Sequence, residues 1–415
     1  MSYFRINIYL LLKFFLLSFL YRKKNIDELI QKLMIKNSLK KFFILTSQLR
    51  VGFLILLKYF QKINPEKKEI IFSPYNIPEM VSVAKNLNYE VVFCDVDLKT
   101  GFFCFKKLKK KINHRTSAVV MTNMFNSYED SLKLRKLCDY KKVNLIEDNA
   151  IYFDNFIQKK KKTYSGSIGH YSLYSFNLMK NISALYGGGV STNDNNFYNF
   201  AKKEIANFRN FSIYIYTRQI LIYLILKILS VNFIYKFFFF SIIKFAYKKN
   251  IKFLLQIFYP ILRFKYQKFP SYYFTKMNRF SKNMVYLQLA NSNLRKVNHS
   301  SRKEKNNSYM QLFQEAKMPE INLFRINDFN FQNFLDFPIV VKNKKKLINF
   351  LLNKKIDTRV IHYKNCAKIF GDKKLYANSD VLENSLLCLP NHYKISKIYM
   401  EFIVERIKFF YTNNK

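Results

Sequence analysis

The 415-residue sequence has few cysteines, glycines, prolines and acidic residues, and these shortages exclude several classes of protein. Its five cysteines form no CxxC pair and no metal-like spacing with the five histidines, which argues against a disulfide framework and a zinc site. This use of cysteine fits a reducing cytoplasm. No internal repeat is visible, so a solenoid or propeller is not expected.

Acidic residues number 27 against 71 lysines and arginines, which gives a formal net charge of +44. Such an excess usually indicates a nucleic-acid or anionic-membrane partner. Here the excess is spread along the chain and accompanies many Phe, Tyr, Ile and Asn residues, as expected for drift toward AT-rich codons. No nucleic-acid-binding module and no basic cluster on one predicted face is present, so we expect no nucleic-acid partner.

Two apolar stretches raise the question of membrane contact. The first, Ile8 to Tyr21, has 14 residues with Lys13 inside, which is short for a bilayer span, and no small-residue cleavage site follows it. The second, Gln219 to Tyr247, is interrupted by three lysines and contains no run of 18 uncharged residues. The second stretch fits either a helix at the inner membrane surface or a helix packed on the protein itself, and a membrane span is a third, less favoured alternative. We expect a cytoplasmic protein, with peripheral membrane contact as an open alternative.

Hydrophobic residues make up 49% of the chain, enough for a sizeable core and two or three domains. From residue 69 onward, short β-rich runs alternate with helical ones, which predicts βαβ units and a parallel sheet. The runs are EIIFSP, a helix over 79–87, EVVFCDVD, SAVVMTNM, a helix over 128–140, and VNLIED. Ligands collect at the carboxyl ends of such strands, and Glu147 and Asp148 end the last of these runs.

Glycine is concentrated in one part of this glycine-poor chain. Five of the eight glycines fall within 24 residues, at positions 166, 169, 187, 188 and 189. A chain that is losing glycine keeps it where backbone sterics leave little choice. Between these glycines lies Ser175, five residues before Lys180. Lys180 would place an amine just past a strand end, near the crevice that holds Asp148, where it could form a Schiff base.

These motifs carry a family resemblance. IEDNA, followed by SGSIGHYSLYSFNLMKNISALYGGGVSTND, resembles the DegT/DnrJ/StrS family of sugar aminotransferases, which are fold type I enzymes that use pyridoxal 5'-phosphate (PLP). The similarity extends to SPYNIPEMVSVAKNLNYEVVFCDVDLKTG and to LENSLLCLPNHYKIS. It implies an α/β large domain with a mostly parallel central sheet flanked by helices, and a smaller C-terminal α+β domain. The expected division is 1–40 apolar and helical, 41–210 PLP-binding, 211–270 apolar helical insertion, and 271–415 helix and small domain.

The resemblance implies the roles of two residues at the reacting centre. Lys180 would bond through its amine to the cofactor aldehyde and then act as general acid and base in a proton shift. Asp148 would pair with the pyridine nitrogen and keep it protonated, so that the ring accepts electron density from the substrate. A lysine at position 180 also separates aminotransferases from the related dehydratases, in which the resemblance would predict histidine.

Other residues are assigned to the cofactor phosphate through the same resemblance. Ser175 would donate its hydroxyl to the phosphate, and Ser47 with Gln48 occupies the place of a second phosphate loop at a helix N-terminus. Gly187 to Gly189 would form a tight turn beside the lysine. A second subunit completes the site in this family, and Asn278 lies near the position of the asparagine that it supplies, which implies a homodimer.

The sequence also departs from the family pattern. Ile151 stands where glutamine or histidine is common, and His170 stands where aspartate is common. The expected function is transfer of an amino group, from glutamate, to a nucleotide-linked keto sugar for cell-surface polysaccharide or amino-sugar biosynthesis. The alternative is a catalytically impaired protein of the same fold that acts as a binding or assembly factor at the membrane surface.

Overall fold

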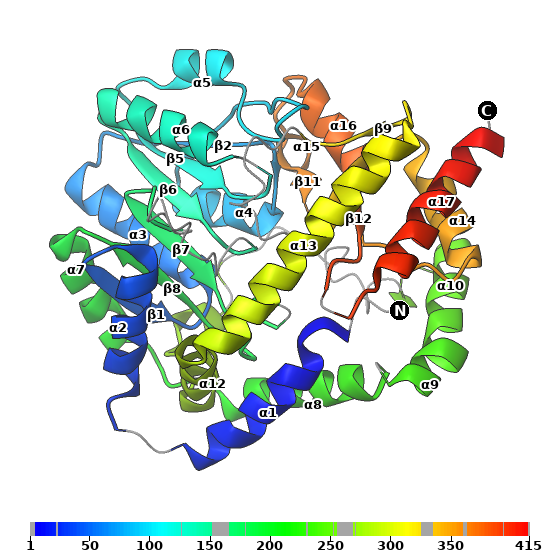
Figure 1. Cartoon of the computed structure of the whole chain (residues 1–415). Coiled ribbons are helices and arrows are strands. Elements are labelled where there is room, and N and C mark those ends of the chain that lie inside the picture. Colours follow the sequence, from blue (N-terminus) through cyan, green and yellow to red (C-terminus); the bar gives the residue numbers. More distant parts are fainter. Residues whose placement is uncertain are drawn as a thin grey trace.

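A computed structural model of the chain has an α/β architecture built around one large sheet (Figure 1). The residues that it describes are 5–21, 24–125, 127–151, 166–178, 180–229, 231–251, 253–254, 269, 271–324, 335–359, 363–392 and 394–413.

The central sheet has seven strands in the order β1-β8-β7-β6-β5-β2-β4. Strand β8 runs antiparallel to both of its neighbours, and the remaining pairs are parallel, so the expected mostly parallel sheet is confirmed. The strands are β1 Phe42–Thr46, β2 Glu69–Phe72, β4 Glu90–Phe93, β5 Thr116–Thr122, β6 Asn144–Asp148, β7 Tyr171–Ser175 and β8 Gly188–Thr192.

Helices cover both faces of this sheet, which explains why its central strands are apolar along their whole length. Along β5, Ala118 and Val120 pack into the core formed with α3 and α4, whereas Val119 and Met121 pack into the core formed with α5 and α6. This alternation follows from the two-residue period of a strand. The helices of this part are α2 Ile26–Ser38, α3 Leu49–Ile63, α4 Pro78–Asn86, α5 Phe105–Lys111, α6 Tyr128–Tyr140 and α7 Asn195–Ala206.

The C-terminal part forms its own layer of helices on a three-stranded sheet in the order β12-β10-β9. Its core is apolar and includes Phe337, Ile339 and Leu387. The short strand β11 instead pairs with β3 beside the large sheet and so connects the two parts. The elements are β3 Tyr75–Asn76, β9 Ile321–Asn322, β10 Phe337–Val341, β11 Lys364–Asn365, β12 Leu386–Leu389, α14 Lys344–Asn353, α15 Cys366–Ile369, α16 Ala377–Ser385 and α17 Lys397–Asn413.

Two further helices link the sheets. They are α12 Arg279–Ala290 and α13 Ser292–Ala316, preceded by the short 3-10 helix η3 Ser271–Phe274. The chain turns from α12 into α13 at Asn291, whose side chain accepts a hydrogen bond from the Leu294 N–H at 3.0 Å. Asparagine favours this capping position, so a new helix begins here and the direction of the chain changes.

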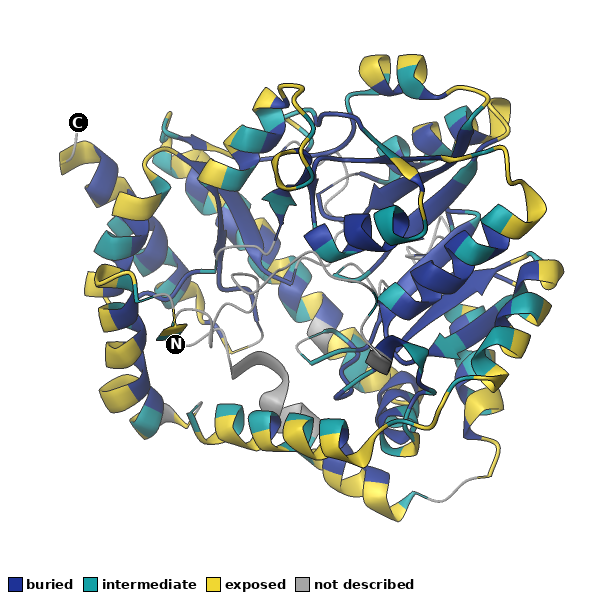
Figure 2. Cartoon of the chain, turned by 180° about the vertical axis from the view of Figure 1, so that it is seen from behind, coloured by how far each residue is buried: buried dark blue, intermediate teal, exposed yellow. Residues whose placement is uncertain are grey.

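The two apolar stretches form helices on the outside of the molecule, along its lower and lateral edge in Figures 1 and 2. They are α1 Arg5–Leu20, α8 Ile213–Leu229, α9 Asn232–Ile234, the π-helical segment η1 Tyr235–Phe239 and α10 Phe240–Lys248. Among the described residues, no helix combines the length and the hydropathy needed to cross a bilayer.

Candidate active site

The residues expected to carry chemistry meet at the carboxyl edge of the central sheet. Asp148 is the last residue of β6 and is buried beside Thr122 of β5 and Leu173 of β7. Its Oδ1 accepts the N–H of Ala150 at 2.9 Å, which fixes the orientation of the carboxyl group. Ser175 ends β7 two residues past Leu173, so it lies farther out along the same edge.

Lys180 lies in a closed loop that follows β7. The Phe176 N–H donates to the Gly187 carbonyl at 2.9 Å, so the two ends of the loop are joined. On α12, Gln288 accepts the Ser183 N–H at 3.0 Å and donates to the Ser183 carbonyl at 2.6 Å. The Ser183 hydroxyl in turn donates to the Lys180 carbonyl at 2.7 Å. Because both ends and the middle are held, the backbone that carries the lysine is positioned before any ligand binds.

The Lys180 amine and the Asp148 carboxyl lie close enough to change each other's ionisation. Burial lowers the pKa of Lys180 to about 8, and the negative charges of Asp148 and Asp336 oppose that shift. Burial raises the pKa of Asp148 to about 6, and the Ala150 N–H and the Lys180 charge oppose it. A lysine with a lowered pKa is more readily a neutral nucleophile at pH 7.

A second part of the site lies where β1 enters α3. Gly188 pairs with Thr46 of β1 on one side and with Ser175 of β7 on the other. Neighbouring strands lie about 5 Å apart, so Ser175 and Thr46 flank the same glycine, and Ser47 follows Thr46 directly in the chain. The Ser47 hydroxyl oxygen is buried and has no hydrogen-bond partner among the described residues. Gln48 precedes α3 without capping it through its side chain, so the N-terminus of the helix is available for an anion.

The three consecutive glycines differ from their expected role. Gly188 and Gly189 belong to strand β8 and form no turn. A Cβ on Gly188 would lie 2.3 Å from the Leu49 nitrogen, and one on Gly189 would lie 2.3 Å from the Phe43 ring. Glycine is required here because the start of α3 and a core aromatic ring pack directly against the strand.

Asn278 occupies a position near this cradle in the same chain. It is the N-cap of α12, and its Oδ1 accepts the Phe280 N–H at 2.8 Å. The preceding residue, Met277, packs so closely on Gly187 that a Cβ there would lie 2.6 Å from the Met277 methyl. The capping oxygen is therefore occupied, and the amide nitrogen is the atom with which Asn278 would bind an anion.

The C-terminal part contributes three polar residues that the sequence motifs did not reveal. Asp336 lies near Lys180, and its buried Oδ2 accepts from Arg359 at 2.7 Å. Burial raises the pKa of Asp336 to about 7, and Arg302 and Lys180 oppose the shift. Tyr363 is buried near Asp148, and burial and the Asp148 charge raise the pKa of its hydroxyl. No local pattern marks these residues, because more than 150 positions separate them from Lys180.

Ile151 packs in the apolar cluster that contains Tyr75, Tyr363 and Phe125. The Ile151 side chain has no hydrogen-bonding atom, so this residue can offer a ligand only apolar contact. The described residues also contain no group of three or more His, Cys, Asp or Glu side chains placed to hold a metal ion.

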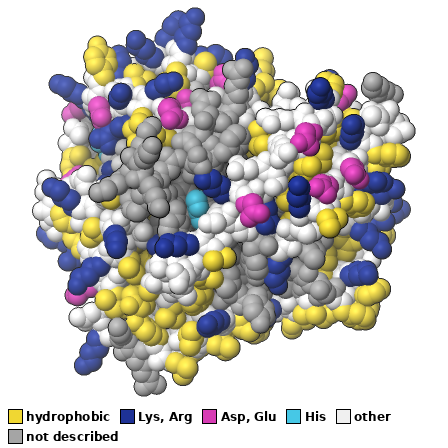
Figure 3. All heavy atoms as spheres, viewed as in Figure 1, with side chains coloured by type: hydrophobic (Ala, Val, Ile, Leu, Met, Phe, Trp, Pro, Cys, Tyr) yellow, Lys and Arg dark blue, Asp and Glu magenta, His cyan; other side chains and the backbone are white. Residues whose placement is uncertain are grey.

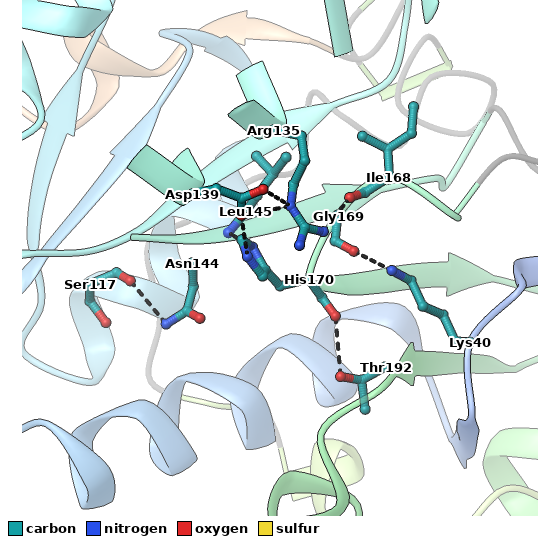
Figure 4. Close-up of polar contacts among 10 residues, drawn as sticks. All are labelled: Lys40, Ser117, Arg135, Asp139, Asn144, Leu145, Ile168, Gly169, His170 and Thr192. Atoms are coloured by element: carbon teal, nitrogen blue, oxygen red, sulfur yellow. Dashed lines mark hydrogen bonds and ion pairs between the residues drawn. The ribbon is translucent and has the colours of Figure 1, made fainter. Parts of the chain in front are cut away.

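His170 lies at the opposite edge of the sheet, before β7 begins (Figure 4). Its Nδ1 accepts the Leu145 N–H at 2.8 Å, so its proton is on Nε2, which lies 2.9 Å from the Asp139 carboxylate. Burial and the positive charge of Arg135 lower the pKa of His170 to about 4. The same cluster contains Lys40, whose Nζ donates to the Gly169 carbonyl at 2.6 Å. The departure at His170 is therefore a structural contact remote from the candidate site.

Comparison with known proteins gives the site its context. Residues 25–220 match the DegT/DnrJ/EryC1/StrS aminotransferase family. The chain is 27% identical over 145 residues to the UDP-4-amino-4,6-dideoxy-N-acetyl-beta-L-altrosamine transaminase of Helicobacter pylori. That alignment covers 35% of this chain and 38% of the relative, so it spans well under half of the relative's length.

Solved structures resemble the chain over nearly its whole length. PseC of Helicobacter pylori, an aminotransferase involved in the biosynthesis of pseudoaminic acid, superposes with a TM-score of 0.66 and 17% identity over 95% of this chain and 94% of its own. The GDP-4-keto-6-deoxy-D-mannose-3-dehydratase of E. coli, solved with bound hydrated PLP, superposes with a TM-score of 0.69 and 16% identity over 96% of each chain. The fold of this protein is therefore that of the fold type I PLP enzymes. Residues 25–220, a little under half of the chain, are thus similar to the DegT/DnrJ/EryC1/StrS aminotransferase family.

Proposed function

We propose that this protein is a PLP-dependent aminotransferase that moves an amino group from an amino acid, glutamate, to the keto group of a nucleotide-linked sugar. Such a product would serve cell-surface polysaccharide or amino-sugar biosynthesis. The single observation that carries the proposal is the pairing of Lys180 with Asp148 at the carboxyl edge of the sheet, where each charge shifts the pKa of the other group.

The residues present fit PLP. The cofactor has an aldehyde, a ring nitrogen and a phosphate, and the site offers an amine at Lys180, a buried carboxyl at Asp148 and an anion cradle at the start of α3. One feature of the cradle suits a phosphate in particular: the Ser47 hydroxyl is buried without a partner among the described residues. Ser175 and Gln48 flank the same cradle.

The residues of the candidate site have definable tasks when PLP is bound. PLP supplies an electron sink for the bond changes at the substrate carbon. The Asp148 carboxylate holds a proton on the ring nitrogen, and Lys180 carries the proton that moves between substrate atoms. The C-terminal part contributes the Arg359–Asp336 pair near Lys180 and Tyr363 near Asp148.

The direct test is incubation of the purified protein with PLP, nitrogen-labelled glutamate and a panel of nucleotide keto sugars. We expect labelled nitrogen to replace the keto oxygen of one sugar, as measured by mass spectrometry. A product that has lost a hydroxyl group and contains no label would indicate a dehydratase, the activity named for the E. coli structural neighbour. If no sugar changes, the interpretation as an impaired binding protein replaces this proposal.

Two finer expectations belong to the same proposal. We expect two copies of the chain to assemble as a homodimer, with the Asn278 amide directed toward a cofactor phosphate. Peripheral contact with the inner face of a membrane would bring the enzyme close to the site of polysaccharide assembly. Size-exclusion chromatography with light scattering tests the first, and Asn278→Ala is expected to weaken PLP binding without loss of the dimer.

Replacement of Gln288 by alanine is expected to weaken the loop that positions Lys180. The change removes both hydrogen bonds to Ser183 and leaves buried backbone groups unpaired, which costs about 1–3 kcal/mol. The rate of amino transfer should fall together with the free energy of unfolding measured in urea. Gln311→Ala is the control, because Gln311 is an exposed helical glutamine whose side chain donates a hydrogen bond to Glu315, and the change should alter neither quantity. Equal stability and activity in both variants would contradict the assigned role.

A further inference from the structure

Exposed hydrophobic side chains are concentrated in two segments of the chain. Of the 26 exposed large hydrophobic residues among the described positions, seventeen lie within 16–20 of α1 and 213–253. The most exposed of these include Leu20 at 79% and Phe233 at 63%. Figure 2 shows the exposed outer faces of α1, α8 and α10, and Figure 3 shows hydrophobic side chains gathered along the lower part of the molecule. We call the exposed residues of these two segments the apolar arc.

The arc is the outer side of helices whose inner side packs on the protein. On α8, Tyr216 and Tyr223 are buried, and Tyr223 lies 5.7 Å from the Phe15 ring of α1, so the two helices lie side by side. The exposed residues follow the helical period on the opposite face. On α8 they are Ile213, Tyr214, Leu221, Leu224, Ile225 and Ile228, and on η1 and α10 they are Phe237, Phe238, Ile242 and Phe245. A monomer that stayed in water would ordinarily place polar residues at these positions.

The charge around the arc has one sign. Residues 1–26 and 205–303 contain no Asp or Glu, so all 27 acidic residues lie in the remainder of the chain. Residues 205–303 contain 18 lysines and arginines. Shorter acid-free segments occur elsewhere, the longest of them being 155–193 with 39 residues, but 205–303 spans 99 residues and is by far the longest in the chain. The exposed cations Lys13, Arg218 and Lys236 lie on the same helices as the arc.

We propose that the apolar arc is the surface by which this protein binds the headgroup region of an anionic lipid bilayer. Apolar side chains on one face of a helix, flanked by cations, are typical of helices that lie in the plane of a membrane interface. The arc does not cross the bilayer, because no described helix has the required length and hydropathy. The corner where α8 meets α9 and η1 carries Ile228, Val231, Phe233 and Phe237, and it inserts deepest.

A second copy of the chain fits this surface less well than lipid. A two-fold interface places the same surface on both sides, so each cation of one arc would face the cations of the other. No acidic side chain of residues 1–26 or 205–303 is present to compensate that repulsion. An anionic bilayer supplies both an apolar phase and the opposite charge.

The experiment uses the full chain, which contains no tryptophan. Phe233→Trp places a single reporter at the corner, and Leu375→Trp places one at a residue that is 82% exposed outside the arc. Both variants are mixed with vesicles of phosphatidylcholine alone and with vesicles that contain one third phosphatidylserine. With the anionic vesicles only, we expect the protein in the vesicle pellet and a blue shift of the tryptophan fluorescence. That shift should occur for the tryptophan at position 233 and not for the one at position 375. Binding should weaken as salt increases.

Paired variants separate the apolar contribution from the charged one. The double variant that carries Leu221→Ser and Ile225→Ser is expected to bind vesicles at least about tenfold more weakly. The double variant that carries Arg218→Gln and Lys236→Gln is expected to show a loss of similar size at low salt. The matched controls are Leu375→Ser with Ile398→Ser and Lys373→Gln with Lys374→Gln. These residues are also exposed but lie outside the arc, so the control variants should bind like the unchanged protein. None of these residues belongs to the candidate active site, so cofactor absorbance should stay unchanged in all of them.

Three results would overturn the proposal. The first is equal binding to neutral and anionic vesicles, and the second is equal loss of binding in the arc variants and their controls. The third is a concentration-dependent dimer that dissociates in the Leu221→Ser and Ile225→Ser variant while no form of the protein pellets with vesicles; that result would assign the arc to a second copy. Each readout is independent of catalysis, so failure here and failure of the proposed aminotransferase activity are distinguishable.

Discussion

Lys180→Ala is expected to abolish amino transfer and to remove the absorbance band above 400 nm that the unchanged protein should show with PLP. The rate should fall by at least about 10⁴-fold, because the variant loses both the covalent attachment and the group that carries the proton. The loop around position 180 is held by backbone and Ser183 contacts that do not use the lysine amine, so the variant should fold normally. Absorbance spectra with added PLP and thermal unfolding curves measure the two effects.

The control for this prediction is Lys40→Ala. Burial lowers the pKa of Lys40 to about 8, as it does for Lys180, but the Lys40 amine donates to the Gly169 carbonyl at the far edge of the sheet. Lys40→Ala should therefore reduce stability while the absorbance band remains. If the band persists in the Lys180→Ala protein, or disappears only in the Lys40→Ala protein, the assignment of Lys180 is wrong.

Asp148→Asn is expected to make the protein less active and more stable at the same time. An amide cannot hold a proton on the cofactor ring nitrogen as a carboxylate does, so the rate should fall by about 10²–10³-fold, the usual cost of removing one electrostatic group at a reacting centre. The Ala150 N–H can still donate to the amide oxygen, so the local geometry is retained. Steady-state kinetics at saturating PLP measure the loss of rate.

The gain in stability has a defined dependence on pH. Burial raises the pKa of the Asp148 carboxyl from 3.8 to about 6 in the folded chain, so folding favours the protonated form. The stability that this carboxyl contributes is complete below about pH 4 and is lost as the pH rises through 6. Asparagine does not ionise, so the free energy of unfolding of the variant should exceed that of the unchanged apoprotein by up to about 3 kcal/mol at pH 8 and by little at pH 4.

Glu147→Gln on the same strand gives the opposite result and serves as the comparison. The Glu147 carboxylate accepts the N–H groups of Gly166, Ile168 and Gly169 at 2.8–3.1 Å, so its charge is used by the fold. Replacing it with an amide is expected to lower the free energy of unfolding by about 1–3 kcal/mol. Urea unfolding of both variants at pH 5 and pH 8 tests the contrast, and a loss of stability in Asp148→Asn at pH 8 would contradict the burial argument.

The two neighbouring carboxylates show why burial alone does not identify a functional group. Glu147 points to the side of β6 where backbone N–H groups of residues 166–169 surround it, and Asp148 points to the side that faces Lys180. Successive residues of a strand project to opposite faces, so one is used by the fold and the other is kept ionisable next to an amine at the expense of stability. Such a cost at a buried site is typical of a position retained for function.

Several features of this protein follow from the sequence by itself. The alternation of apolar runs with helical ones predicts the mostly parallel sheet, and the helix expected over 128–140 is α6, Tyr128–Tyr140. Strand order also predicts that Asp148 and Ser175 lie at the ligand-binding edge of the sheet. Local propensity and short connections are sufficient for these predictions, whereas the expected cofactor came from the resemblance of the motifs around Lys180 to a PLP-dependent family.

Other features depended on contacts between distant parts of the chain. Strand β11 pairs with β3 beside the large sheet, and the same C-terminal part places Asp336, Arg359 and Tyr363 near Lys180 and Asp148; no pattern within one segment encodes that meeting. Tertiary packing also assigned Gly188 to a strand against the start of α3, where the pattern had indicated a turn. It likewise selected which face of α8 is exposed. The sequence by itself determined the helices and strands and indicated Lys180 as the candidate amine. Packing determined the surroundings of that amine, because side-chain burial and the pKa shifts that follow from it depend on neighbours far away in the chain.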